Sequence, residues 1–307
     1  MRTLLLDDLA HQARAIVRLS GPDTPRFVQG TISANVEPLA DAVAVTAALC
    51  TVKGKLVSEL VVLPAGSNTI DLLVPRDVAA AVAESLDRHI IMDDVEVAPP
   101  ADTSVGIAWD GDEHAPAPTI VGEGIRTFAT RHPGPGRLVL GARDAVLAAL
   151  ASGDATDANG WAARRIATAT PAWGHEITAD VFPPEVGFVH AVSYDKGCFM
   201  GQEPLARIHA RGQVNRVLVR VKLASDPGEA PAPLVDDAGT QVGRLTTWAP
   251  GGDAFLGLAI VRRKVAVAGH VLRTDAIVAE VIAGPLGDDP GVGNKKRSGT
   301  VKLGRRG

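Results

Sequence analysis

Short apolar runs separated by turn residues dominate the first third of the chain. Ala42 to Val52 and Leu56 to Leu63 are dense in Val, Ala and Leu, and the turn Gly54-Lys55 between them predicts a β-hairpin. Thr69 to Val74 is a further apolar run and predicts another strand. This region therefore indicates strands that are interleaved with helices.

Helices are predicted where capping residues precede an apolar face. The stretch Gly21 to Pro25 combines cap residues with a proline that suits a first helical turn. Asp77 is the predicted N-cap of a second helix that continues to about His89. A second α/β segment is expected beyond the loop-forming stretch 111–118, with strands near 124–130 and 137–140 and helices over 144–151 and 157–168.

After about Val214 the pattern changes to short strands separated by Gly, Pro and Asp, predicted at residues 217–223, 241–245, 255–261, 271–273 and 277–281. Evenly spaced short strands are typical of a small β-barrel. We therefore expect an α+β protein with an N-terminal α/β domain (1–105), a second α/β domain (106–212), a C-terminal β-barrel (213–286) and a disordered basic tail (287–307).

Composition and charge narrow the class of protein. Hydrophobic residues make up 46% and charged residues 21% of the chain, as in ordinary globular proteins. Six of the 31 basic residues and none of the 35 acidic residues lie from Lys295 onward, so the body is acidic and no nucleic-acid partner is expected. No apolar run reaches the ~20 residues of a membrane helix, and the N-terminus lacks the apolar core of a signal peptide. A cytoplasmic location without a membrane partner is expected.

The chain has two cysteines, Cys50 and Cys198, too few for a disulfide framework, a zinc site or an iron–sulfur cluster site, and no metal site is expected. Cys50 lies in an apolar strand and is interpreted as a small buried side chain. Cys198 stands between glycines, which predicts a tight turn that fixes its thiol. Lys196 and Arg207 are cations that can stabilise a thiolate nearby. From spacing alone, a small buried residue is the favoured interpretation of Cys198 as well.

The run Lys196 to Glu203, Lys-Gly-Cys-Phe-Met-Gly-Gln-Glu, resembles the signature of the YgfZ family, which reads KGC, an aromatic, any residue, then GQE. The resemblance extends along nearly the whole chain, to segments at 30–35, 47–55, 165–174 and 239–247. The family shares its fold with the T protein of glycine cleavage, an aminomethyltransferase that uses tetrahydrofolate. The resemblance therefore implies two α/β segments around a central cavity that holds a pterin, followed by a β-barrel.

The same resemblance implies a tetrahydrofolate ligand and a role in the assembly or repair of iron–sulfur proteins, with folate and client or assembly proteins as partners. Cys198 and Lys196 then become candidate catalytic residues. The candidate folate-binding residues are Asn35, Trp173, Tyr194, Gly197, Gly201, Gln202, Glu203 and Arg207. Arg207 suits the glutamate carboxylate of folate, and the rings of Trp173 and Tyr194 suit stacking on the ligand.

The chain departs from the transferases at two places. They carry an Asp pair where this chain has Val57-Ser58-Glu59-Leu60, and a Glu where it has Ala167 and Thr168. Because these carboxylates are the obvious acid–base groups, aminomethyl transfer is disfavoured. A true aminomethyltransferase or demethylase remains an alternative and would use carboxylates such as Glu59 or Glu203. A partner-docking scaffold without folate is another alternative, although docking has no evident need for a buried, glycine-flanked thiol.

Overall fold

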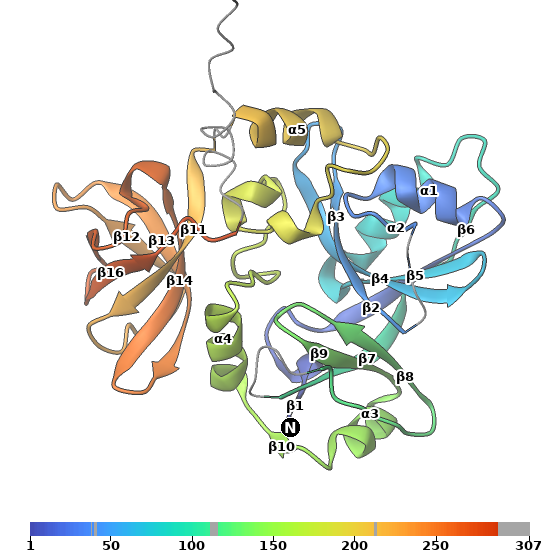
Figure 1. Cartoon of the computed structure of the whole chain (residues 1–307), viewed down its shortest axis with the longest axis horizontal. Coiled ribbons are helices and arrows are strands. Elements are labelled where there is room, and N and C mark those ends of the chain that lie inside the picture. Colours follow the sequence, from blue (N-terminus) through green and yellow to red (C-terminus); the bar gives the residue numbers. More distant parts are fainter. Residues whose placement is uncertain (38, 40–41, 111–115, 212–213, 288–307) are drawn as a thin grey trace, which may run out of the picture.

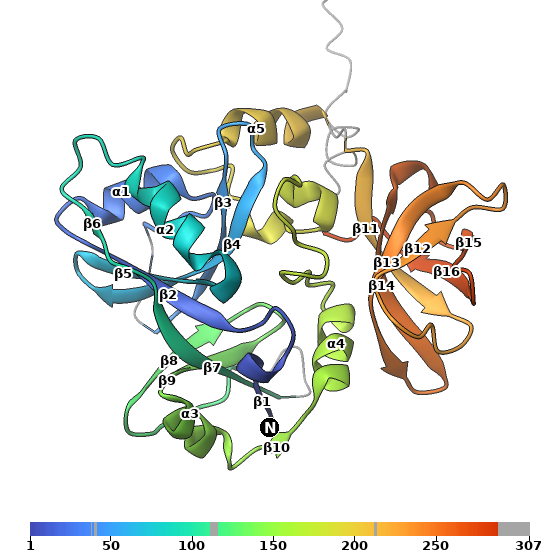
Figure 2. The same cartoon turned by 180° about the vertical axis from the view of Figure 1, so that it is seen from behind.

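The computed structural model describes residues 1–37, 39, 42–110, 116–211 and 214–287 of the chain. It has an α+β architecture in which a large mixed sheet and a closed β-barrel lie on opposite sides of a central region of helices and loops (Figures 1 and 2). The predicted fold class is confirmed. The basic tail, residues 288–307, lies outside the described residues.

Within the described residues, the larger sheet has ten strands. Seven of them follow one another in the order β10-β1-β7-β2-β5-β4-β3. Of the other three, β6 pairs with β2, β9 pairs with β7, and β8 pairs with β9. All its pairs are antiparallel except β1 with β10. The strands are β1 (Arg2–Leu5), β2 (Arg14–Ser20), β3 (Val45–Cys50), β4 (Leu56–Gly66), β5 (Thr69–Pro75), β6 (Glu96–Val97), β7 (Ala101–Trp109), β8 (Ile125–Thr130), β9 (Gly136–Gly141) and β10 (Asp154–Ala155).

Helices cover this sheet because its central strands are apolar on both faces. On β4, Leu60 and Val62 pack under two helices, whereas Leu63 packs into a second cluster on the other face. This two-sided burial explains the continuous apolar run of β4. The helices of this half are α1 (Thr24–Thr31), α2 (Ala79–Asp87), α3 (Arg143–Leu150), α4 (Ala158–Ala167) and α5 (Gln202–Arg211), with short 3-10 turns η1 (Leu6–Asp8), η2 (Arg76–Val78), η3 (Pro183–Val186) and η4 (Val189–Ala191).

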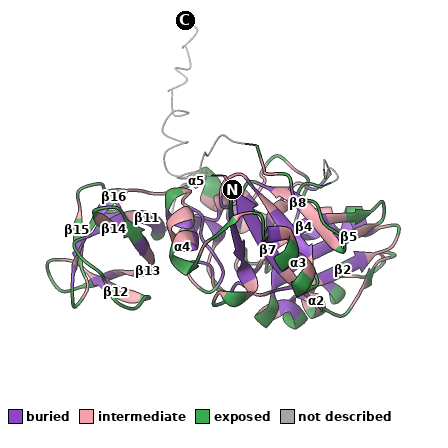
Figure 3. Cartoon of the chain, turned by 90° about the horizontal axis from the view of Figure 1, so that it is seen from below, coloured by how far each residue is buried: buried purple, intermediate pink, exposed green. Residues whose placement is uncertain are grey.

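The C-terminal strands close into a six-stranded barrel in the order β11-β14-β13-β12-β15-β16. The strands are β11 (Arg216–Leu223), β12 (Ala232–Val235), β13 (Gln241–Gly251), β14 (Ala254–Arg262), β15 (Val271–Arg273) and β16 (Val278–Ala283), and η5 (Arg263–Val265) follows β14. Val217, Val219 and Val221 point into the barrel core. Leu218, on the alternate face, is instead buried against the body of the protein. The barrel is therefore packed onto the rest of the chain. Figure 3 shows β11, which carries Leu218, coloured largely as buried.

Most predicted elements are confirmed, including the hairpin β3–β4, the strand β5 and five strands of the barrel. The prediction for Asp77 was wrong, because its side chain makes no cap hydrogen bond and instead accepts one from the Trp173 indole at 3.2 Å. Strands β1, β2, β7, β10 and β12 and helix α5 were not predicted. The expected boundary at residues 105 and 106 falls inside β7, which pairs with β2 at its start and with β1 and β9 farther on.

None of the helices in the described part of the chain is both long enough and apolar enough to span a membrane.

Candidate functional site

The Lys-Gly-Cys segment connects η4 to α5 and lies against the end of α1. Its Lys196 ammonium donates hydrogen bonds to the carbonyl oxygens of Gln29, Ile32 and Ala34 at 2.5, 2.9 and 2.7 Å. An ammonium has three donors, so these bonds use its full capacity. Burial lowers the pKa of Lys196 to about 8, although nearby Glu37 acts in the opposite direction. Lys196 therefore anchors the motif to the chain that leaves α1.

The two glycines of the motif have different surroundings. Gly201 has φ +81°, and a Cβ at this position would overlap the carbonyl oxygen of Thr51 in the β3–β4 turn. Gly197 is exposed, and a Cβ added there would have no other atom within 4 Å. Gly201 is therefore required by close packing of the motif on the β3–β4 turn, whereas Gly197 leaves open space beside the neighbouring cysteine.

Cys198 is exposed, and the expectation of a buried thiol at this position was wrong. The motif turns over the surface of the β3–β4 turn, so the side chain between its glycines faces solvent. Cys50 is buried as predicted, and burial raises the pKa of its thiol to about 12. Neither predicted cation is free for the Cys198 thiol. Lys196 is held by carbonyls, and Arg207 pairs with Glu203 at 2.9 Å one helical turn away.

The first turns of α5 carry the polar part of the motif. Glu203 and Arg207 are exposed and face each other at positions i and i+4, while Gln202 is half-buried at the start of the helix. Tyr194 stacks on His209 of α5, with ring centroids 4.1 Å apart and planes 17° from parallel. Burial raises the pKa of Tyr194 to about 12. These rings hold the motif against α5.

The other two predicted ligand residues are engaged within the protein. The Trp173 ring is buried in the cluster between the body and the barrel, and its indole donates to Asp77. The Asn35 side-chain oxygen accepts from the Gln29 amide at 2.8 Å and from the Glu37 backbone N–H at 3.2 Å. None of the ten residues singled out from the sequence lines the central cavity described next.

A cavity of about 660 Å³, counted out to its opening, lies where the two halves of the sheet meet α4 and η4. Its walls are contributed by β2, β4, β7 and β9, by α4, and by the segments 130–133 and 170–172. Apolar walls with a small number of polar groups are typical of ligand pockets. The polar and aromatic side chains that line it include Gln12, Arg14, Glu59, His132, Trp161, Arg165, Phe188 and His190.

Four residues that line this cavity carry a buried polar atom that lacks a partner. Among the described residues, Nη1 of Arg14, Nε1 of Trp161, Nε of Arg165 and Nε2 of His190 are buried without a hydrogen bond, and all four residues line the cavity. Native proteins leave few buried polar groups unsatisfied, because each costs about 1–3 kcal/mol. Three of these atoms are obligate N–H donors. The cavity therefore suits a ligand with hydrogen-bond acceptors.

The charged groups at the cavity form two ion pairs. Arg14 on β2 reaches Glu59 on β4 at 2.6 Å, and both side chains are largely buried. Arg165 on α4 reaches Glu176 at 2.7 Å, just behind the cavity wall. Glu59 is the carboxylate among the described lining residues, and it supplies acceptor capacity opposite the donors. The sequence pointed to Glu59 as an alternative catalytic group but gave no sign that Arg14 would face it.

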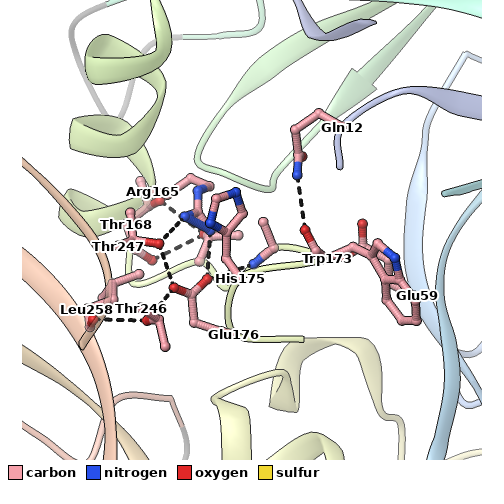
Figure 4. A network of polar contacts seen from close by, with 12 residues as sticks. Gln12, Glu59, Arg165, Thr168, Trp173, His175, Glu176, Thr246, Thr247 and Leu258 are labelled. Carbon is pink, nitrogen blue, oxygen red and sulfur yellow. Dashed lines mark hydrogen bonds and ion pairs between the residues drawn. The ribbon is translucent and has the colours of Figure 1, made fainter. Parts of the chain in front are cut away.

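The Arg165–Glu176 pair belongs to a wider network that joins α4 to the barrel (Figure 4). Glu176 accepts hydrogen bonds from the hydroxyls of Thr246 and Thr247 on β13 at 2.6 and 2.7 Å and from the Ala172 backbone N–H. Thr247 in turn accepts from Arg165 at 2.6 Å. The Arg165 charge and these bonds outweigh burial and lower the pKa of the Glu176 carboxyl. The network positions the arginine that lines the cavity.

Two histidines form one wall of the cavity. The rings of His132 and His190 stack with centroids 3.6 Å apart, and Phe188 meets His190 edge-on at 5.1 Å. Burial lowers the pKa of His132 to about 4, assisted by the charge of Arg131, and lowers the pKa of His190 to about 3. The pair is therefore neutral near pH 7 and offers an aromatic face to a planar ligand. In the sequence, neither histidine belongs to a motif or spacing that would have marked it as a site residue.

Among the described residues, no group of His, Cys, Asp and Glu side chains is arranged to hold a metal ion. The chemistry that the arrangement supports is recognition: donors, one ion-paired carboxylate and flat aromatic walls line the same cavity. The exposed thiol of Cys198 is a separate feature outside this cavity.

Comparisons with known proteins place these features in context. No family model matches the chain. It is 24% identical to an iron–sulfur cluster assembly factor IBA57 homolog, mitochondrial, from Neurospora crassa, over 74% of this chain and 56% of that protein. It is 26% identical to the tRNA-modifying protein YgfZ of Pectobacterium carotovorum, over 66% of each chain. The chain thus spans between about half and two thirds of the length of these relatives.

The structure is similar to that of glycine cleavage system aminomethyltransferase T from Bartonella henselae, with a TM-score of 0.77 over 94% of this chain and 86% of that one. The two sequences are 14% identical, so this likeness shows the fold alone. Together these matches confirm the resemblance to YgfZ-type proteins and the T-protein-like fold.

Proposed function

We propose that this protein binds a tetrahydrofolate derivative in its central cavity and acts as an accessory protein in the assembly or repair of iron–sulfur proteins. The relatives named as iron–sulfur cluster assembly factors support the process, and the T-protein-like fold supports the ligand class. Iron–sulfur client or assembly proteins are the proposed partners. The bound folate would supply a carrier of one-carbon groups.

The observation that carries the ligand proposal is the set of unpartnered donors at the cavity. A pterin ring offers carbonyl and ring-nitrogen acceptors at one edge and N–H donors at another. Arg14, Trp161 and Arg165 supply donors for the first edge, and the Glu59 carboxylate supplies an acceptor for the second. The faces of His132 and Phe188 provide flat surfaces for the ring. The residues present therefore fit this group.

The ion pairing in the cavity favours binding over aminomethyl transfer. Glu59 is paired with Arg14 at 2.6 Å, so its carboxylate is already engaged by a guanidinium within the protein. Glu203, the other carboxylate considered for catalysis, is exposed on α5 and does not line the cavity. These positions support an accessory protein over a transferase.

Trp161→Phe is expected to weaken tetrahydrofolate binding by about tenfold. The substitution keeps an aromatic ring but removes the Nε1 donor, and the loss of a hydrogen bond in a buried site corresponds to roughly 1–2 kcal/mol. Calorimetric titration of the purified protein measures the change. Trp109→Phe is the matched control, because Trp109 is equally buried and packs on Trp161 without lining the cavity. Equal losses in both variants would indicate a packing effect and remove this support for the site.

Cys198→Ala is expected to leave tetrahydrofolate affinity within about twofold of the wild type, because the exposed thiol does not line the cavity. The same variant is expected to fail to restore iron–sulfur enzyme activity in cells that lack the protein. The titration measures folate binding alone, so it separates the folate site from the role of the Cys198 thiol in cells. A large loss of folate affinity in Cys198→Ala would contradict the division between an internal folate site and a surface thiol.

The docking-scaffold alternative keeps one supporting observation, which is that the predicted motif lies on the surface and outside the cavity. Absence of saturable tetrahydrofolate binding by the wild-type protein, with complementation of the iron–sulfur defect intact, would favour that alternative over the folate proposal.

A further inference from the structure

Three arginines lie on one outer face of the barrel. In the β11–β14 pair, Arg216 is directly opposite Arg262, and in the β13–β14 pair Arg244 is opposite Ile260. Residues two apart on a strand point to the same side, so Ile260 and Arg262 share a face. Arg216, Arg244 and Arg262 therefore project from the same side of three neighbouring strands.

No acidic side chain of the described residues compensates the charges of this face. Within the described residues, Arg216, Arg262 and Lys264 make no ion pair, and Arg244 donates a hydrogen bond of 3.5 Å to the His175 carbonyl oxygen. Elsewhere on the barrel, Arg273 is paired with Asp237 at 3.7 Å. Like charges directly opposite each other on adjacent strands are destabilising. The pair Arg216–Arg262 therefore carries a cost in stability that nothing in the described structure offsets.

The arginines surround hollows in the surface. Arg216 and Arg262 line two adjoining hollows of about 730 and 950 Å³, both counted out to open solvent. Arg244 lines the first, and Lys264 of η5 lines the second. The Arg263 backbone N–H donates to the Asn215 carbonyl oxygen at 3.0 Å, which keeps η5 beside the start of β11. The cations are thus arranged around concave surface on the closed barrel.

We propose that this barrel face, formed by Arg216, Arg244, Arg262 and Lys264, is a docking site for an acidic segment of a partner protein. Guanidinium groups pair with carboxylates through two parallel hydrogen bonds, and neighbouring arginines suit closely spaced Asp or Glu side chains. The chain outside the final 13 residues carries 25 basic and 35 acidic residues. An extended nucleic acid would meet this acidic body, whereas a short acidic segment avoids it. The partner's carboxylates would also relieve the repulsion between Arg216 and Arg262.

A hexaglutamate peptide with a fluorescent label is the probe, and its binding to the full-length protein is measured by anisotropy at low and at high salt. The double variant Arg216→Ser/Arg262→Ser is expected to weaken binding at least fivefold at low salt. The control Lys222→Ser/Arg273→Ser removes the same charge from other exposed barrel positions and is expected to change affinity less than twofold. Both variants retain the basic C-terminal residues, so the comparison isolates the barrel face.

Thermal unfolding provides a second readout. Arg216→Ser/Arg262→Ser is expected to unfold at the same temperature as the wild type or higher, because it removes opposed like charges. Failure of the wild type to bind the peptide, or equal weakening in both double variants, would overturn the proposal. The proposal would also be overturned, in favour of a nucleic-acid site, if an eight-nucleotide single-stranded nucleic acid bound more tightly than the hexaglutamate peptide and lost this binding in Arg216→Ser/Arg262→Ser. Tetrahydrofolate titration should be unchanged in either variant, which keeps this test independent of the cavity.

Discussion

Glu176→Met lowers the free energy of unfolding by about 3–5 kcal/mol, the range for removal of one partner from a buried ion pair. The substitution leaves the Arg165 guanidinium buried without its counter-ion and removes an acceptor of the Thr246 and Thr247 hydroxyls. Because these bonds join α4 to the barrel, loss of stability is expected together with weaker tetrahydrofolate binding. Chemical denaturation followed by fluorescence, with the folate titration beside it, measures both effects.

The double variant Arg165→Met/Glu176→Met is the control for this prediction. It removes both charges, so it should recover a large part of the stability that either single variant loses. The pKa of the Glu176 carboxyl is lowered on folding from its usual 4.5, so its contribution is complete above about pH 4.5 and is lost as pH falls through the lower folded value. The stability difference between the wild type and Glu176→Met should therefore shrink in acid. A double variant as unstable as the sum of the singles would show that the ion pair is not the cause.

Gly201→Ala lowers the free energy of unfolding by about 3 kcal/mol, from roughly 1–2 kcal/mol for a side chain at positive φ and the rest from steric overlap. The backbone at Gly201 has φ +81°, and a Cβ there would overlap the carbonyl oxygen of Thr51. Either the β3–β4 turn or the whole motif must move to make room. Thermal unfolding measures the loss, and the reactivity of the Cys198 thiol toward a small alkylating reagent reports displacement of the motif.

Gly197→Ala is the matched control in the same motif. This position is exposed, its φ is not positive, and nothing lies within 4 Å of an added Cβ. A change within about 0.5 kcal/mol is expected, as for ordinary surface substitutions. If Gly197→Ala is as destabilising as Gly201→Ala, helix or loop propensity explains both results better than the contact with Thr51.

The sequence predicted the elements whose signals are local. The hairpin β3–β4 was predicted because two apolar runs flank a Gly-Lys turn, and the barrel was predicted from evenly spaced alternating strands. Strand β2 was missed because Arg14 and Arg18 interrupt its apolar pattern, and these arginines are held by the carboxylates of Glu59 on β4 and Asp71 on β5. A charge that is neutralised by a residue distant in sequence has no local signature.

For the candidate site, too, the sequence revealed the contiguous part and not the part assembled from distant segments. The motif around Cys198 was visible because its residues are contiguous, yet they lie at the surface and Lys196 holds the backbone after α1. The cavity is lined by Arg14, Glu59, Trp161 and His190, which come from four separate segments. Their sequence spacing carries no period or motif, so they could not be grouped before the fold brought them together. Their identification depends on the cavity that they line together and on the unpartnered atoms of Arg14, Trp161 and His190.

The sequence by itself determined the α+β class, the barrel, the buried state of Cys50 and the resemblance to YgfZ-type proteins, because composition, alternation and short contiguous motifs are properties of neighbouring residues. Only the tertiary structure decided that Cys198 is exposed, that Glu59 is neutralised by Arg14 and that Arg216 faces Arg262. Burial and charge pairing depend on contacts between segments far apart in the chain, and strand register sets those contacts.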